Sequence, residues 1–197
     1  TILVYVNKYD AQVVDKLIKQ NDLIDNCNDE GEVITLYYGR KYDMETKWVA
    51  PWTYKLRNCE KIYSTDVMPY ENYGYRFKTS LTDSDNVWTS VEERPTTTAH
   101  WAVCKAQDYF KNSFDLNIND LLQLYVKLDG LYNSSFGEGQ YNTLFGKKPY
   151  NFIKIGKING NYCSTVDIVA HEYAHCLISY YSSKLDEYGE SGALNES

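Results

Sequence analysis

Short runs in which apolar and polar residues alternate fill much of the sequence and predict strands. The patterns at Glu32–Tyr38 and Trp52–Leu56 are interrupted by Gly, Asn, Asp and Pro residues. This profile is typical of a meandering antiparallel sheet, which is expected over residues 31–94. Leu122–Leu128 alternates without interruption and predicts a strand with one buried face.

Two segments have the periodicity of helices instead. Within Ala99–Phe110, apolar residues recur at i, i+3, i+4, i+7, i+10 and i+11, which predicts one long helix packed on the sheet, with its N-cap in Thr96–Thr98. A second helix is expected over about residues 165–182. Ser164 is its expected N-cap, with Asp167 three residues later as in a capping box. The predicted fold class is therefore α+β: an antiparallel, β-sheet-rich domain with a packing helix and a second helix that closes it.

The first clear break in these patterns is the polar segment Asn26–Gly31. Before it, Ile2–Val6 and Ala11–Val14 are separated by a polar turn and predict a β-hairpin. Two interpretations of this hairpin stay open. It is either an ordinary N-terminal part of the domain or a separate unit that ends near residue 30.

Composition limits the partners. The hydrophobic content of 43% supports a packed core, and the net charge is −7. Without a Lys/Arg run to neutralise phosphates, no nucleic-acid partner is expected. No apolar run approaches the roughly 18 residues of a membrane span, so no membrane partner is expected either. Among the five cysteines, Cys104 and Cys176 fall on apolar helix faces, and Cys27 with Cys59 is the only pair considered for a disulfide.

The strongest chemical signal is His171-Glu172-Tyr173-Ala174-His175. Two histidines four residues apart on a helix project from one face and can bind one metal ion. Glu172, beside the first histidine, is placed to take a proton from a metal-bound water. The alternative is an incidental pair of surface or core histidines beside a glutamate.

A second carboxylate, Glu196, follows His175 after 21 residues. That separation allows the helix to end, the chain to turn and a new helix to return Glu196 to the histidines. Two histidines and one carboxylate leave the fourth tetrahedral position of Zn²⁺ open, which is the arrangement of catalytic zinc sites. A third histidine in an H-E-x-x-H-x-x-G-x-x-H pattern is excluded, because Cys176–Ser179 follows and no later histidine exists.

With these residues the chain resembles the thermolysin-like zinc metallopeptidases. The resemblance rests on the 171–175 motif and Glu190–Glu196, and it extends from about residue 95 to the end and, more weakly, over residues 31–94. Four further segments support it: Ala99–Trp101, Asp108–Asn112, Tyr132–Phe136 and Val166–Ala170.

The resemblance implies a zinc-dependent endopeptidase. Zinc would be bound by His171, His175 and Glu196, and Glu172 would be the general base that activates water and later protonates the leaving amine. Asn195 resembles a family residue that supports the zinc ligands. The substrate is expected to be a peptide or protein.

Ser134, Ser135 and Phe136 match the edge strand with which the family's substrates pair in antiparallel fashion. The resemblance places the Ser135 carbonyl opposite the scissile region. Ser134 replaces an Asn that contacts substrate, and Gly137 replaces a Trp, so the family's side-chain preference is not carried over. A simple edge strand without substrate is the alternative.

Three acidic residues resemble calcium ligands of the family. Asp83 and Asp85 match a calcium-binding loop, although Val87 stands where another oxygen ligand is expected. Asp167 matches another calcium ligand. A polar turn at the first two and helix capping at Asp167 are the alternatives. His100 also matches a family histidine and is interpreted as a structural hydrogen-bonding residue.

The resemblance also predicts the organisation of the protein. Residues 1–30 would be the end of a prodomain, and residues 31–197 the N-terminal catalytic domain, truncated before a helical C-terminal domain. In the family that domain supplies a His and a Tyr that stabilise the oxyanion, and only Ser197 follows Glu196 here. We therefore expect a fragment of a secreted precursor with little activity alone. A non-catalytic zinc-containing peptide-binding module and an inhibited precursor are the alternatives.

Overall fold

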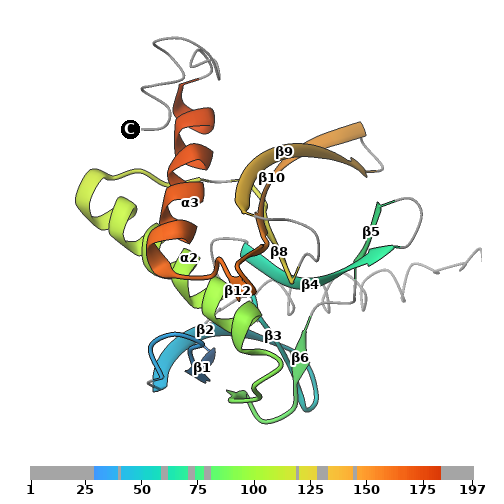
Figure 1. Cartoon of the computed structure of the whole chain (residues 1–197). Helices are drawn as coiled ribbons and strands as arrows, with labels where there is room; N and C mark the ends of the chain where they lie inside the picture. Colours follow the sequence, from blue (N-terminus) through green and yellow to red (C-terminus); the bar gives the residue numbers. More distant parts are fainter. Residues whose placement is uncertain are drawn as a thin grey trace, which may run out of the picture.

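The computed structural model describes residues 29–39, 41–58, 62–70, 74–77, 81–118, 120–127, 133–143 and 146–182. In these residues two five-stranded sheets, one two-stranded sheet and two helices form an α+β domain, which confirms the predicted fold class (Figure 1). The expected N-terminal hairpin, the Cys27–Cys59 pair, Asn195 and Glu196 lie outside them. Neither described helix combines the length and apolar character needed to cross a lipid bilayer.

The N-terminal sheet has the strand order β6-β3-β2-β1-β7. Its strands are β1 (Asp29–Ile34), β2 (Lys41–Ala50), β3 (Thr53–Lys55), β6 (Thr82–Asp83) and β7 (Val87–Trp88). The pairs β1–β2, β2–β3 and β3–β6 are antiparallel, as the meander predicts, whereas β7 joins β1 in parallel.

The central sheet has the strand order β5-β4-β8-β10-β9. Its strands are β4 (Ile62–Tyr70), β5 (Gly74–Phe77), β8 (Leu122–Val126), β9 (Ser134–Thr143) and β10 (Gly146–Ile155). The inner strands β4, β8 and β10 are parallel, and only the outer pairs β4–β5 and β9–β10 are antiparallel. The expected antiparallel sheet is here a mixed one. The connection from β4 to β8 contains helix α2, which permits a parallel crossover, and β9 returns the chain so that β10 also runs parallel to β8. Two short strands, β11 (Lys157–Ile158) and β12 (Asn161–Tyr162), pair separately.

The helices α2 (Arg94–Phe114) and α3 (Val166–Tyr181) pack against each other. The expected packing helix is α2, which contacts strands of both sheets, while α3 lies against the β9–β10 end of the central sheet (Figure 1). The side chains that fill the space between these layers are almost fully buried: Val33, Leu56, Ile62, Trp88, Leu122, Leu124, Ile153, Ile155, Tyr173 and Cys176. This core fixes α3 beside the edge of the central sheet.

Both helices begin differently from the sequence prediction. Helix α2 starts at Arg94, with Pro95 in its first turn, where the missing N–H of proline costs no hydrogen bond. Thr96–Thr98 are therefore buried helical residues, and the Thr98 hydroxyl accepts a hydrogen bond from the Leu36 N–H at 2.7 Å. Helix α3 has Thr165, not Ser164, at its N-cap position and no side-chain cap, and Ser164 is buried.

His100 on α2 is a structural residue, as interpreted from the sequence. It is fully buried, with Nδ1 2.7 Å from the Ser64 hydroxyl and Nε2 3.0 Å from the Glu45 carbonyl oxygen. Because a carbonyl only accepts, Nε2 carries the proton and donates, and Nδ1 accepts from Ser64. Burial lowers the pKa of His100 to about 4, although the bond to Glu45 opposes the shift. The neutral ring joins the helix to both sheets.

This burial predicts an acid-sensitive fold. The pKa of His100 falls from 6.5 in the unfolded chain to about 4 in the folded one. Its contribution to the free energy of unfolding is therefore complete above pH 6.5 and is lost as pH falls towards 4, by about 3 kcal/mol in all. Urea unfolding between about pH 7 and pH 5 measures this loss.

The control is His100→Gln, which cannot titrate. It is expected to be less stable at every pH and to lose less stability on acidification than the wild type, in which carboxylates and His100 titrate together. Equal losses in the two proteins would contradict the assignment.

Candidate active site

The two histidines of the motif converge on one face of α3. His171 and His175 lie in its second and third turns, and their Nε2 atoms are 3.0 Å apart. Their rings are nearly perpendicular, at 82°. Two nitrogens bound tetrahedrally to one zinc ion at 2.0–2.1 Å would lie about 3.3 Å apart. The observed separation therefore fits a shared metal ion.

Glu172 faces the protein interior beside these histidines, with an exposed fraction of 6%. His171 is exposed and His175 half-buried, so the carboxylate lies behind an accessible pair of imidazoles. Burial of the nearby Cys163, together with the negative charge of Glu172, raises the pKa of the Cys163 thiol. Cys163 is thus held as a neutral thiol next to the carboxylate.

The described residues contain two of the three predicted zinc ligands, His171 and His175, but not the third. No group of three or more His, Cys, Asp or Glu side chains in these parts of the chain is arranged to hold a metal ion. Glu196, together with Asn195, lies outside the described residues. Of the three predicted zinc ligands, the structure therefore describes only His171 and His175.

The segment expected to contact substrate is the beginning of β9, the outermost strand at one end of the central sheet. Its prediction as an edge strand is confirmed. Ser134 is buried, with no hydrogen-bond partner for its hydroxyl among the described residues, while Ser135 and Phe136 are half-buried. Helix α3 packs beside this strand. The helix that carries the histidine pair therefore lies beside the edge strand.

Gly137 stands where the resembled family has a tryptophan. The structure shows why a side chain does not fit at this position. Gly137 pairs with Phe152 of β10, and a Cβ added to Gly137 would lie 2.5 Å from the Phe152 ring. Gly139 has the same relation to Tyr150. Aromatic rings from β10 therefore cover both glycines, a known way to stabilise glycines in sheets.

Asp83 and Asp85 form a polar turn. The Asp83 carboxylate accepts hydrogen bonds from the N–H groups of Asp85 and Val87, at 2.9 and 3.3 Å, and Asp85 accepts one from Val87 at 3.0 Å. Burial and its hydrogen bond to Asp85 raise the pKa of Asp83, so the two carboxylates interact closely.

Asp167 lies on a different element, in the first turn of α3. The neighbouring Thr165 hydroxyl and then the backbone N–H groups of that turn lower the pKa of Asp167. A carboxylate there also interacts favourably with the helix dipole. Calcium binding at the three aspartates stays a prediction.

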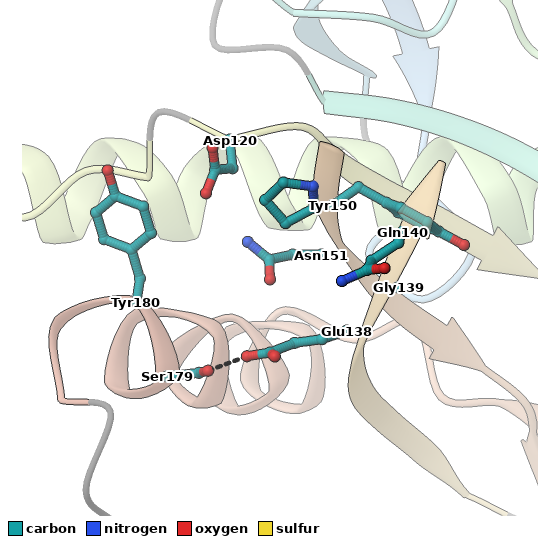
Figure 2. Close-up of a pocket in the computed structure, with 9 residues that line it drawn as sticks. Asp120, Glu138, Gly139, Gln140, Tyr150, Asn151, Ser179 and Tyr180 are labelled. Atoms are coloured by element: carbon teal, nitrogen blue, oxygen red, sulfur yellow. Dashed lines mark hydrogen bonds between the residues drawn. The ribbon is translucent and has the colours of Figure 1, made fainter. Parts of the chain in front are cut away.

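Sequence analysis missed a pocket at the C-terminal end of α3. It has a volume of about 740 Å³ and lies between α3, the strands β9 and β10, and the segment before β8 (Figure 2). The Glu138 carboxylate accepts a hydrogen bond from the Ser179 hydroxyl across it. The only signal in the sequence was that Ser179 follows His175 by four residues and so shares its helix face. The polar residues that line it are Asp120, Glu138, Gln140, Asn151, Ser179 and Tyr180.

The family to which known proteins assign this chain agrees with a helix that carries two converging histidines. Residues 31–179 match the family model described as the catalytic domain of thermolysin metallopeptidases. The chain belongs to this family, and the resemblance inferred from the metal motif is confirmed.

Three curated relatives are similar over part of their length. Bacillolysin of Bacillus cereus is 31% identical over 118 residues, which cover 58% of this chain and 19% of the relative. Bacillolysin of Brevibacillus brevis is 28% identical over 149 residues, or 74% of this chain and 26% of the relative. A zinc metalloproteinase of Listeria monocytogenes is 30% identical over 121 residues, or 59% and 22%. The chain thus spans about a fifth to a quarter of these relatives.

Proposed function

We propose that this chain is the N-terminal part of a secreted, zinc-dependent endopeptidase. The observation that carries the proposal is the 3.0 Å approach of the His171 and His175 Nε2 atoms, with the buried carboxylate of Glu172 between them in the sequence. Two imidazoles are common zinc ligands, and the separation fits one ion. Glu196 is proposed as the third ligand, supported in position by Asn195.

When bound, zinc supplies Lewis acidity, which lowers the pKa of water and polarises a peptide carbonyl. His171 and His175 would hold the ion, and their Nε2 atoms, 3.0 Å apart, would be the donor atoms. A carboxylate oxygen of Glu172 accepts the proton of the attacking water and then delivers it to the leaving amine nitrogen. Its burial limits competition from bulk water for that proton.

The substrate is proposed to be an extended peptide that adds a strand to β9. An outermost strand presents unpaired N–H and C=O groups, which can bind a peptide backbone without regard to its sequence. Ser134, Ser135 and Phe136 are the residues of β9 proposed to contact it. The packing of α3 beside β9 brings such a peptide past the histidine pair.

Metal removal tests the proposal. The purified full-length protein is expected to contain stoichiometric zinc and to cleave a quenched fluorescent peptide. Treatment with 1,10-phenanthroline should abolish cleavage, and added zinc should restore it, because the metal is needed for the chemistry. The measurements are metal analysis and initial rates.

Two comparisons make this test specific. Zinc-loaded protein that binds peptides without cleaving them would favour the non-catalytic binding module. The isolated 197-residue chain is expected to show little or no turnover, since it spans only about a fifth to a quarter of the curated relatives. Robust, chelator-sensitive turnover by that chain would refute the second expectation.

A further inference from the structure

The pocket at the end of α3 lies on the same helix face as the metal motif. His171, His175 and Ser179 follow one another at intervals of four residues, so they share one face, and each interval corresponds to about 6 Å along the axis. The pocket therefore begins about one helical turn beyond the second histidine. Its other wall is β9, the edge strand proposed to bind the peptide.

The polar groups in this pocket are mainly hydrogen-bond acceptors. Glu138 on β9 is exposed to the pocket and is oriented by the Ser179 hydroxyl, and Asp120 lies on the opposite side (Figure 2). Neither carboxylate forms an ion pair with a described lysine or arginine, and no lysine or arginine is among the described residues that line the pocket. Burial of Cys176, and then the charges of Glu138 and Asp120, raise the pKa of the Cys176 thiol at the base of this region. The electrostatic potential in this pocket is therefore negative.

A second observation points to a ligand. Asn151 is directly opposite Glu138 in the β9–β10 pair, and its exposed fraction is only 8%. Its backbone N–H donates to the Leu121 carbonyl at 2.8 Å, and its side-chain amide, which forms no hydrogen bond with the described residues, points into the pocket (Figure 2). This amide is not among the enclosed side-chain groups that lack a partner, so its polar atoms can be reached from the pocket. A molecule in the pocket can therefore supply the hydrogen-bond partner.

We infer that this pocket binds a cationic side chain, arginine or lysine, of the peptide substrate. Two carboxylates and the amide oxygen of Asn151 offer acceptors from different directions, which suits the several N–H donors of a guanidinium or ammonium group. The volume of about 740 Å³ exceeds what a single metal ion needs. The inference rests on the proposed function, because the peptide that carries the cationic side chain is proposed to bind along β9.

The distance along α3 from His175 to the pocket limits which residue of the peptide can place its side chain there. One helical turn beyond His175 is about 6 Å, and an extended peptide advances about 3.3 Å per residue. The cationic residue is therefore expected about two positions from the cleaved bond.

The test compares peptides that contain arginine or citrulline, which has the same shape without the charge, at each position around the bond. The full-length protein is expected to cleave the arginine peptide about tenfold faster in kcat/KM at one position. Glu138→Gln should bring that ratio close to one, and Asp120→Asn should lower it too, which provides a second variant if Glu138→Gln does not fold. Asp43→Asn, the same charge change on exposed β2 of the N-terminal sheet, should leave the ratio unchanged.

Several results would overturn the inference. The first is a ratio of arginine-peptide to citrulline-peptide kcat/KM near one at every position. The second is a fall of this ratio in Asp43→Asn as large as in Glu138→Gln, which would indicate only a long-range effect of charge. If no peptide is cleaved, the proposed function fails, and calorimetry with Nα-acetyl-arginine amide and its citrulline analogue decides the pocket separately. Binding of the arginine amide that is lost in Glu138→Gln supports the pocket. Binding of calcium alone through Glu138 makes it a metal site and contradicts the inference.

Discussion

Replacing Glu172 by glutamine in the full-length protein is expected to lower kcat/KM for peptide cleavage by about 10³-fold. Glutamine has nearly the same shape, but its amide cannot accept the proton of the attacking water. Because Glu172 is not one of the proposed zinc ligands, the variant should retain its zinc. Initial rates and metal analysis on the same preparation measure both quantities.

Glu172→Asp is the matched variant. It keeps the carboxylate but withdraws it by one methylene group, so activity should fall less than in Glu172→Gln. A glutamine variant with near-normal turnover would remove Glu172 from the role of base. Loss of zinc in that variant would instead assign the carboxylate to the metal site.

Replacing His175 by alanine is expected to weaken zinc binding strongly. The loss of a residue that only hydrogen-bonds to a metal ligand weakens metal binding by roughly 10–100-fold, and the loss of His175 should weaken it by more. The reason is that one of two converging Nε2 donors disappears. Zinc affinity is measured by competition with a fluorescent chelator. The free energy of unfolding of the zinc-free protein should change little, since His175 is only half-buried.

The third histidine gives the opposite pattern. His100→Gln should keep its zinc and lose stability, because His100 is fully buried and hydrogen-bonded to two strands. If His100→Gln lost zinc while His175→Ala kept it, the assignment of the metal site to α3 would be wrong.

Local patterns were enough to predict the elements that carry the chemistry. The periodicity of residues 99–110 predicted α2, the alternation of residues 122–128 predicted β8, and the H-E-x-x-H spacing predicted that His171 and His175 converge. These features depend on neighbours within a few residues. Propensity and side-chain spacing therefore describe them well.

Features that depend on distant parts of the chain were not predictable in this way. Strand patterns do not state which strands pair, so the parallel alignment of β4, β8 and β10 was missed. Ser164 was a reasonable N-cap by residue type, but the helix begins one residue later, with Thr165 at the N-cap position and Ser164 buried. The pairing of Glu138 with Asn151 depends on the register of β9 and β10, and the contact of Glu138 with Ser179 depends on tertiary packing.

The rings that lie across Gly137 and Gly139 have an evolutionary consequence. A Cβ on either glycine would lie 2.5 Å from an atom of the Phe152 or Tyr150 ring, so that ring must turn aside or be replaced. A large residue at position 137 or 139 therefore needs a rearranged or smaller side chain opposite it on β10. Replacements at positions 137 and 152 are accordingly expected to occur together more often than separately.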